Sequence, residues 1–145
     1  MNIVNIKRLN KKATMPNKSH DNDAGFDLYA CIDSPINIIP GETIKIPTGW
    51  AIAVPEGYFG AIYARSGLAT KQGLRPANCV GVVDAPYRGE CIVAIYNDSN
   101  IIQQINPNDR IAQFVITPYY NCVLNEVDEL NTTDRGDNGF GSSGK

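Results

Sequence analysis

Turn-forming residues interrupt this chain so often that they limit what it can fold into. Thirteen glycines and nine prolines are spread over 145 residues, and the apolar runs between them are short. Several of these runs alternate apolar and polar residues, as in residues 26–31 and 58–64, which is the period of a half-buried strand. No segment keeps the 3.6-residue period of a helix for more than a turn or two. The pattern predicts an all-β sandwich or barrel.

The predicted strands follow one another at short intervals, separated by turn signals. They are expected over residues 3–9, 26–31, 36–39, 43–46, 50–54, 58–64, 80–83, 91–96, 101–105, 111–119 and 122–127. A helical turn or two is expected around residues 66–71, within a long loop over residues 65–77. The runs on either side of residues 84–89 are expected to pair as a β-hairpin, because a turn marked by proline and glycine joins them.

The C-terminal residues 131–145 differ in composition from the rest of the chain. They are polar, rich in glycine and serine, and too poor in apolar side chains to stay folded alone. We therefore expect one all-β domain over residues 1–130, large enough to bury a core. A flexible Gly/Ser-rich tail over residues 131–145 is expected to follow it.

Residues 139–144 of this tail match the spacing of a dinucleotide-binding motif. That interpretation fails because no βαβ unit surrounds the motif. Two others stay open. The tail is either a disordered linker, or a segment whose backbone N–H groups and hydroxyls (Ser142, Ser143) close over a phosphate. In the second case Arg135 supplies a cation and Phe140 stacks on a ring.

Composition argues against several classes of function. A net charge of -2 at pH 7 disfavours a nucleic-acid or anionic membrane partner. No apolar run approaches the roughly 20 residues of a membrane span and no secretory signal is visible, so we expect a cytoplasmic or other intracellular protein. The four separated cysteines are expected to be buried free thiols. With His20 as the only histidine, neither a zinc site nor Ser-His-Asp catalysis is expected.

Asp84 is the leading candidate for a general base, since histidine is scarce. It directly follows the apolar run over residues 80–83, where a carboxylate would be partly desolvated. Tyr87 shares its turn. Asp27 is a weaker candidate on pattern alone, because an acid in an alternating strand usually lies on the solvated face.

Two short segments suggest phosphate binding. Arg65-Ser66-Gly67 combines an arginine, a hydroxyl and the backbone donors of a helix start. In isolation, an N-cap serine beside a surface arginine explains the same residues better. Arg110 and Gln113 lie at the start of a strand, where period two places them on opposite sides. One of them would then serve a site and the other an interface.

Five segments together resemble the motifs of trimeric deoxyuridine triphosphate nucleotidohydrolases (dUTPases), in the family's order and spacing. They are residues 24–30, 64–69, 78–90, 109–114 and 135–144. The resemblance covers essentially the whole chain. It implies a distorted jelly-roll or β-barrel subunit of the dUTPase type, and a homotrimer with active sites shared between subunits. It further implies that water attacks the α-phosphorus of dUTP, with Mg²⁺, to give dUMP and pyrophosphate.

The resemblance also implies a role for each matching residue. Asp84 would activate the attacking water, and Tyr87 would pack on the deoxyribose and exclude a 2′-hydroxyl. Asp27 would reach Mg²⁺ through water. The other residues expected to bind the substrate are Arg65, Ser66, Gly67, Asn78, Gly81, Val83, Gln113, Arg135, Phe140, Gly141, Ser142 and Ser143. Within this set, Asn78 and the backbone of residues 81–83 would read the uracil edge.

Three positions depart from the family pattern. Pro86 stands where the family usually has an acid, and proline removes an N–H and pushes Ala85 towards an extended conformation. Asn138 replaces a usual glycine, and Ser143 replaces a usual threonine while keeping the hydroxyl. We expect a changed turn at Pro86 with the chemistry intact.

Two alternative functions stay open at this point. A dCTP deaminase-like enzyme would share the fold and the phosphate-binding parts. It would need a glutamate as the base, and the nearest glutamate, Glu90, does not lie at the position where that family has it. A nucleotide-gated regulatory trimer would use the same site for signalling.

Overall fold

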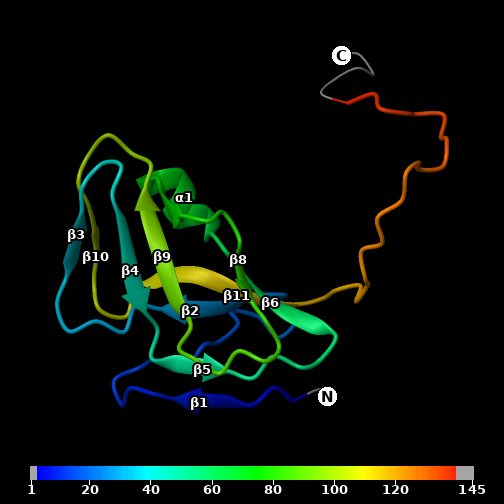
Figure 1. Cartoon of the computed structure of the whole chain (residues 1–145). Helices are drawn as coiled ribbons and strands as arrows, with labels where there is room; N and C mark the ends of the chain where they lie inside the picture. The colour runs from blue at the N-terminus through cyan, green and yellow to red at the C-terminus, as the bar shows by residue number, and fades with distance from the viewer. Residues whose placement is uncertain (1–2, 140–145) are drawn as a thin grey trace.

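The computed structural model describes residues 3–139, which form eleven strands and one short helix (Figure 1). The elements are β1 (Ile6–Arg8), β2 (Phe26–Tyr29), β3 (Ile36–Ile38), β4 (Thr43–Pro47), β5 (Trp50–Ile52), β6 (Tyr58–Tyr63), α1 (Ser66–Gln72), β7 (Leu74–Pro76), β8 (Gly81–Val83), β9 (Ile92–Asn97), β10 (Gln103–Ile105) and β11 (Arg110–Pro118). The predicted all-β fold is confirmed. In this part of the chain no helix is long and apolar enough to cross a membrane.

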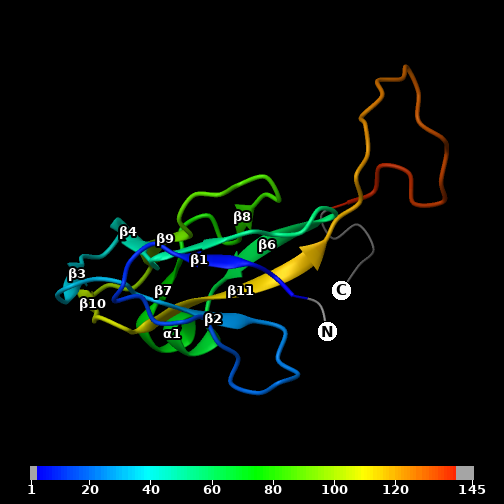
Figure 2. The same ribbon diagram turned by 90° about the horizontal axis from the view of Figure 1, so that it is seen from below.

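The strands form antiparallel sheets around one apolar core. One sheet has the order β2-β11-β6-β8 and another the order β4-β9-β7, with two-stranded sheets β1-β5 and β10-β3 beside them. β11 is the longest strand and pairs with both β2 and β6. Both views place β3 and β10 at the end of the molecule away from the point where the chain leaves β11 (Figures 1 and 2).

The contact between β6 and β11 explains one glycine of the core. The ring of Phe114 is 1% exposed and lies over Gly60, where an added Cβ would come within 2.2 Å of the ring. Any larger residue at position 60 would therefore displace the largest side chain that is less than 2% exposed. This packing holds in place the strand to which β8 is attached.

The predicted β-hairpin is wrong. β8 pairs with β6, whereas β9 pairs with β4 and β7. Residues 84–91, the connecting loop, therefore run from one sheet to another and do not close a local turn between partners. The turn signals were correct, but β8 and β9 each pair with other strands and not with one another.

Three other sequence predictions need correction. β7 lies inside the segment expected to be a loop. Residues 122–127 are not a strand, because residues 120–139 leave the body after β11 and pair with none of the described strands (Figures 1 and 2). The cysteines are free, as expected, but Cys79 and Cys122 are exposed and only Cys91 is buried.

Candidate active site

A cavity of about 240 Å³ lies between β8 and the connecting loop. Its lining is Ile62, Asn78, Gly81, Val82, Val83, Asp84, Tyr87, Glu90, Cys91 and Ile92. Five of these were predicted to belong to the site, and Glu90 was not. β8 is the edge strand of its sheet, so the backbone groups on its outer side have no strand partner among the described residues.

Asn78 reaches this cavity from a tight turn that follows β7. Cys79 has a φ of 61°, and its N–H donates to the carbonyl of Pro76 at 3.1 Å. Arg75 supports the turn by donating to the same carbonyl at 3.3 Å, and its guanidinium stacks over Tyr96 at 4.9 Å. The turn presents Asn78 at the surface next to β8.

Asp84 opens the connecting loop and begins a second turn. The N–H of Tyr87 donates to the Asp84 carbonyl at 3.0 Å, and Pro86 occupies the third position of that turn. The N–H that proline lacks is not needed for this bond. Arg88 donates to the carbonyls of Ala85 and Tyr87 and so braces the turn from inside.

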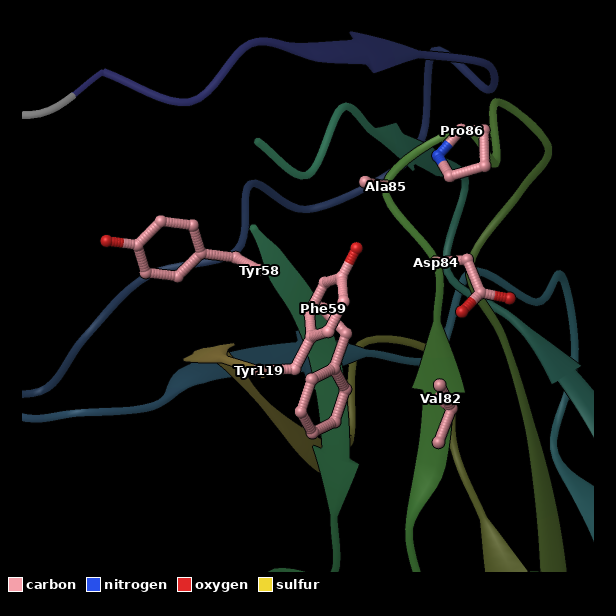
Figure 3. A pocket seen from close by; sticks show the side chains of 7 residues that line it. All are labelled: Tyr58, Phe59, Val82, Asp84, Ala85, Pro86 and Tyr119. Carbon is pink, nitrogen blue, oxygen red and sulfur yellow. The ribbon is translucent and has the colours of Figure 1, made fainter. Parts of the chain in front are cut away.

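The partial desolvation expected for Asp84 is wrong for the single chain, in which the residue is exposed. β8 ends at Val83, so the carboxylate already lies beyond the sheet. A second hollow of about 420 Å³ lies beside it, lined by Tyr58, Phe59, Val82, Asp84, Ala85, Pro86 and Tyr119. Figure 3 shows the Asp84 carboxylate directed away from the three aromatic rings. This apolar hollow does not suit a triphosphate.

A buried carboxylate organises the predicted phosphate-binding residues. Asp27 is 4% exposed and accepts from Arg65 Nε at 2.8 Å and from Arg110 Nη1 at 3.3 Å. It does not lie on a solvated face, contrary to what the alternating pattern of its strand predicts. Burial of this carboxylate is tolerable because two cations surround it.

Gln113 lies on the same face as this ion-paired group. It is directly opposite Asp27 in the pairing of β11 with β2, and an irregularity between Arg110 and Ala112 shifts the register by one residue. The prediction that Arg110 and Gln113 face opposite sides is therefore wrong, since a bulge inverts the period-two count. Asp27, Arg65, Arg110 and Gln113 form one cluster, named here the arginine cluster.

α1 presents Ser66 and Gly67 next to the arginine cluster. The N-cap is Arg65, which makes no side-chain capping bond and instead turns its guanidinium to Asp27. Ser66 is the first helical residue and is exposed. The interpretation of Ser66 as an N-cap is thus wrong, and its hydroxyl faces solvent.

The single chain does not bring the predicted site together. The cavity beneath the connecting loop is lined by none of Arg65, Ser66, Gly67 or Gln113. Arg135 lies in the segment that leaves the body and donates to the carbonyl of Asn138 at 3.0 Å. The predicted tail residues Phe140, Gly141, Ser142 and Ser143 lie outside the described residues.

Two side chains in this region make contacts that the sequence did not predict. Arg110 was expected to serve either a site or an interface, and its ion pair with Asp27 spans 83 residues, a separation that no local pattern encodes. Glu90 accepts the N–H of Gly49 at 2.7 Å. The Pro-Thr-Gly turn at residues 47–49 was the one available signal for this contact.

Metal and thiol chemistry can be judged from the same residues. The described part of the chain has no group of three His, Cys, Asp or Glu that could hold a metal ion. A magnesium ion bound mainly by phosphate oxygens and water would need no such group. Burial raises the pKa of Cys91 to about 11, so this thiol stays protonated near neutral pH and is no nucleophile.

Comparison with known proteins gives a consistent picture. A family model described as dUTPase matches residues 11–144. The chain is 44% identical over 141 residues to a deoxyuridine 5′-triphosphate nucleotidohydrolase of Syntrophotalea carbinolica, with 97% of this chain and 96% of the relative covered. It is 43% identical over 149 residues to the enzyme of that name from Desulfitobacterium hafniense, with 99% of each covered.

Solved structures agree in fold. A mutant dUTPase of Staphylococcus bacteriophage 80alpha with dUpNHpp superposes with a TM-score of 0.90 at 31% identity, covering 100% of both chains. A mutant dUTPase from phage phi11 of S. aureus, described with a structural Mg(II) ion, gives a TM-score of 0.77 at 30% identity. That match covers 88% of this chain and 98% of the phage protein.

Proposed function

Because the chain belongs to the dUTPase family, we infer that it is a dUTP diphosphatase that hydrolyses dUTP to dUMP and pyrophosphate. The observation that carries the mechanism is the convergence of Asn78, Asp84 and Tyr87 on one cavity. An amide, a carboxylate and an aromatic ring at that spacing offer one group each for the base, the attacking water and the sugar.

The base is read by the outer edge of β8. Residues 81–83 line the cavity and belong to an edge strand, so their backbone groups can bind the uracil edge as they would bind another strand. Asn78 adds a side-chain amide at the same place. Cytosine would present a donor where uracil presents an acceptor, and the mismatch would leave buried polar groups unpaired.

The reaction is assigned to Asp84. As the carboxylate at the end of β8 it accepts the proton of a water molecule that attacks the α-phosphorus, acting as general base. Bound nucleotide and a neighbouring chain would remove the solvent that now reaches it, which would strengthen the electrostatic interactions there. Tyr87 packs on the deoxyribose and leaves no room for a 2′-hydroxyl.

The phosphates are assigned to the arginine cluster and the tail. Arg65 and Gln113 are positioned by Asp27 and by β11, and Ser66 and Gly67 add donors from the start of α1. Dispersed donors of this kind suit phosphoryl transfer, which depends mainly on positioning and charge stabilisation. The tail residues Arg135, Phe140, Gly141, Ser142 and Ser143 are proposed to close over the outer phosphates and the base.

Mg²⁺ is the proposed cofactor, and it would neutralise charge on the phosphate oxygens when bound. Asp27 is the residue proposed to reach it through water. Both Asp27 oxygens already accept from arginines, so its contribution is to hold Arg65 and Arg110 as much as to meet the metal.

A homotrimer with shared active sites is proposed from two features. The cavity and the arginine cluster do not meet within one chain. In addition, the segment after β11 exposes large apolar side chains, with Val123 92%, Leu124 93% and Leu130 87% exposed. Exposed apolar surface of this kind is characteristic of an association surface. The substrate and the free thiols are consistent with an intracellular place of action.

The deaminase alternative is disfavoured by Glu90. Its carboxylate accepts the Gly49 N–H at 2.7 Å, so the nearest glutamate is already bound to the scaffold. Isotope labelling tests the proposed reaction. Hydrolysis of dUTP in ¹⁸O-water should place the label in dUMP, since attack is at the α-phosphorus. Label in pyrophosphate would contradict the assignment of Asp84 to that attack.

A further inference from the structure

We propose that Glu90 is a positioning residue that fixes the ring of Tyr87 and thereby sets the enzyme's selection of deoxyribose over ribose. The proposal rests on the proposed function. It concerns a residue that does not contact the scissile bond. Three observations lead to it: the anchoring of the connecting loop, the hydrogen bond made by the Tyr87 hydroxyl, and the exposure of the Tyr87 ring.

The last residues of the connecting loop are anchored to the turn between β4 and β5. Glu90 Oε1 accepts the Gly49 N–H at 2.7 Å. Thr48 Oγ1 donates to the Cys91 carbonyl at 2.6 Å, and the Cys91 N–H donates to the Trp50 carbonyl at 2.8 Å. The two turn residues and the first residue of β5 thus bind two consecutive residues of the loop.

The turn that receives the loop is rigid. Thr48 is 1% exposed. Gly49 has a φ of 76°, and a Cβ there would come within 2.5 Å of Ala13. The carbonyl of Gly49 also accepts the Leu9 N–H at 2.8 Å. The N–H that Glu90 binds therefore belongs to a fixed part of the body, and a carboxylate acceptor makes the bond stronger than a neutral one.

The other end of this connection is the hydroxyl of Tyr87. Its Oη donates to the backbone carbonyl of Glu90 at 3.0 Å. The ring lies over Gly89, where an added Cβ would be 2.3 Å from Oη. The side chain of Glu90 thus fixes the backbone that in turn orients the ring.

The ring has little else to hold it. Tyr87 is 46% exposed, so apart from its contact with Gly89 the bond to residue 90 is what fixes the ring edge. A ring that excludes a 2′-hydroxyl must be held to within a fraction of an ångström. Loosening the Glu90 anchor would therefore admit ribonucleotides before it abolished binding of deoxyribonucleotides.

Three substitutions of Glu90 separate the effect of side-chain length from the effect of charge. Glu90→Gln keeps an oxygen acceptor at the same reach, Glu90→Asp keeps the charge but is too short, and Glu90→Ala loses both. The quantity measured is the ratio of kcat/KM for dUTP to kcat/KM for UTP, with the melting temperature recorded for each variant. We expect this ratio to fall roughly ten-fold in Glu90→Asp and Glu90→Ala, as for the loss of one charge-assisted bond. Glu90→Gln should retain most of it.

Glu42→Ala is the matched control. Glu42 also accepts a backbone N–H across a turn, that of Ile39 at 2.9 Å, but it is far from the cavity in the β3–β4 connection. It should keep the wild-type ratio even if it melts earlier. An unchanged ratio in Glu90→Asp and Glu90→Ala, or an equal fall in Glu42→Ala, would overturn the proposal.

Failure of this inference is distinguishable from failure of the proposed function. If the wild-type chain hydrolyses dUTP and the Glu90 variants keep its ratio, only the role of Glu90 is wrong. If the wild-type chain does not hydrolyse dUTP, the proposed function fails. The dissociation constants of dUMP and UMP, measured by calorimetry on the same variants, then decide the role of Glu90 by the same ratio.

Discussion

Asp27 shows how one buried residue can organise several others. Its two oxygens accept from arginines that come from the residue before α1 and from β11. Removing such a carboxylate would leave two cations close together without compensation. The residue type was visible in the sequence, but its partners lie 38 and 83 positions away, and only the fold reveals them.

Asp84 carries the prediction that belongs to the residue scale. Asp84→Asn removes the proton acceptor while keeping the shape, so we expect kcat to fall roughly 10²–10⁴-fold, as for the loss of a general base. Binding of a non-hydrolysable dUTP analogue should survive. Steady-state kinetics and calorimetry on the same preparation measure the two effects.

Asp33→Asn is the matched control for that variant. Asp33 pairs with Lys12 on the surface, where the two side chains are 79% and 74% exposed, and exposed pairs of this kind contribute little. Its kcat should stay near that of the wild type. Near-normal turnover in Asp84→Asn would show that another group accepts the proton.

The position of the connecting loop is the feature that the sequence predicted least well. Its two predicted site residues, Asp84 and Tyr87, do line the cavity, together with Glu90 and Cys91 of the same loop. Its neighbours β8 and β9 belong to different sheets, because strand pairing is decided by burial over the whole molecule and not by the turn between two runs. The same reason explains why β7, three residues long, was not predicted.

The tail is the element with the sharpest predicted effect. Deleting residues 134–145 removes Arg135 and the Gly/Ser-rich segment, which are proposed to hold phosphates and cover the base. We expect a folded trimer whose kcat/KM for dUTP is at least about 10²-fold lower, since positioned donors at the phosphates are lost. Circular dichroism, light scattering and kinetics measure these properties together.

Removal of Lys145 alone serves as the control for that truncation and should leave turnover unchanged. A truncated chain that fails to fold would make residues 134–145 part of the structural core. That outcome would contradict the division of the chain into a domain and a functional tail.

At the scale of the whole molecule, the separation between the cavity and the arginine cluster predicts complementation. Asp84→Asn and Arg65→Ala should each inactivate a homotrimer. If the two residues act from different chains, random mixing of the two variants should restore about one quarter of the sites, because a site needs one intact partner of each kind. Denaturing and refolding the variants together, followed by a turnover assay, measures this fraction.

The control is the Asp84→Asn variant denatured and refolded alone, which should recover no turnover. Absence of activity in the mixed sample, with trimers formed, would place both residues in one chain and contradict the shared site.

Pyrophosphate release from dUTP, dCTP, dTTP and UTP, assayed side by side, tests the central claim most directly. It examines the reaction, the reading of the base by β8 and the exclusion of ribose by Tyr87 in one experiment. We predict release from dUTP at least about 100-fold faster than from the other three, as expected when a mismatched partner leaves buried polar groups unpaired. Comparable release from UTP or dCTP, or ammonia release from dCTP, would contradict the account.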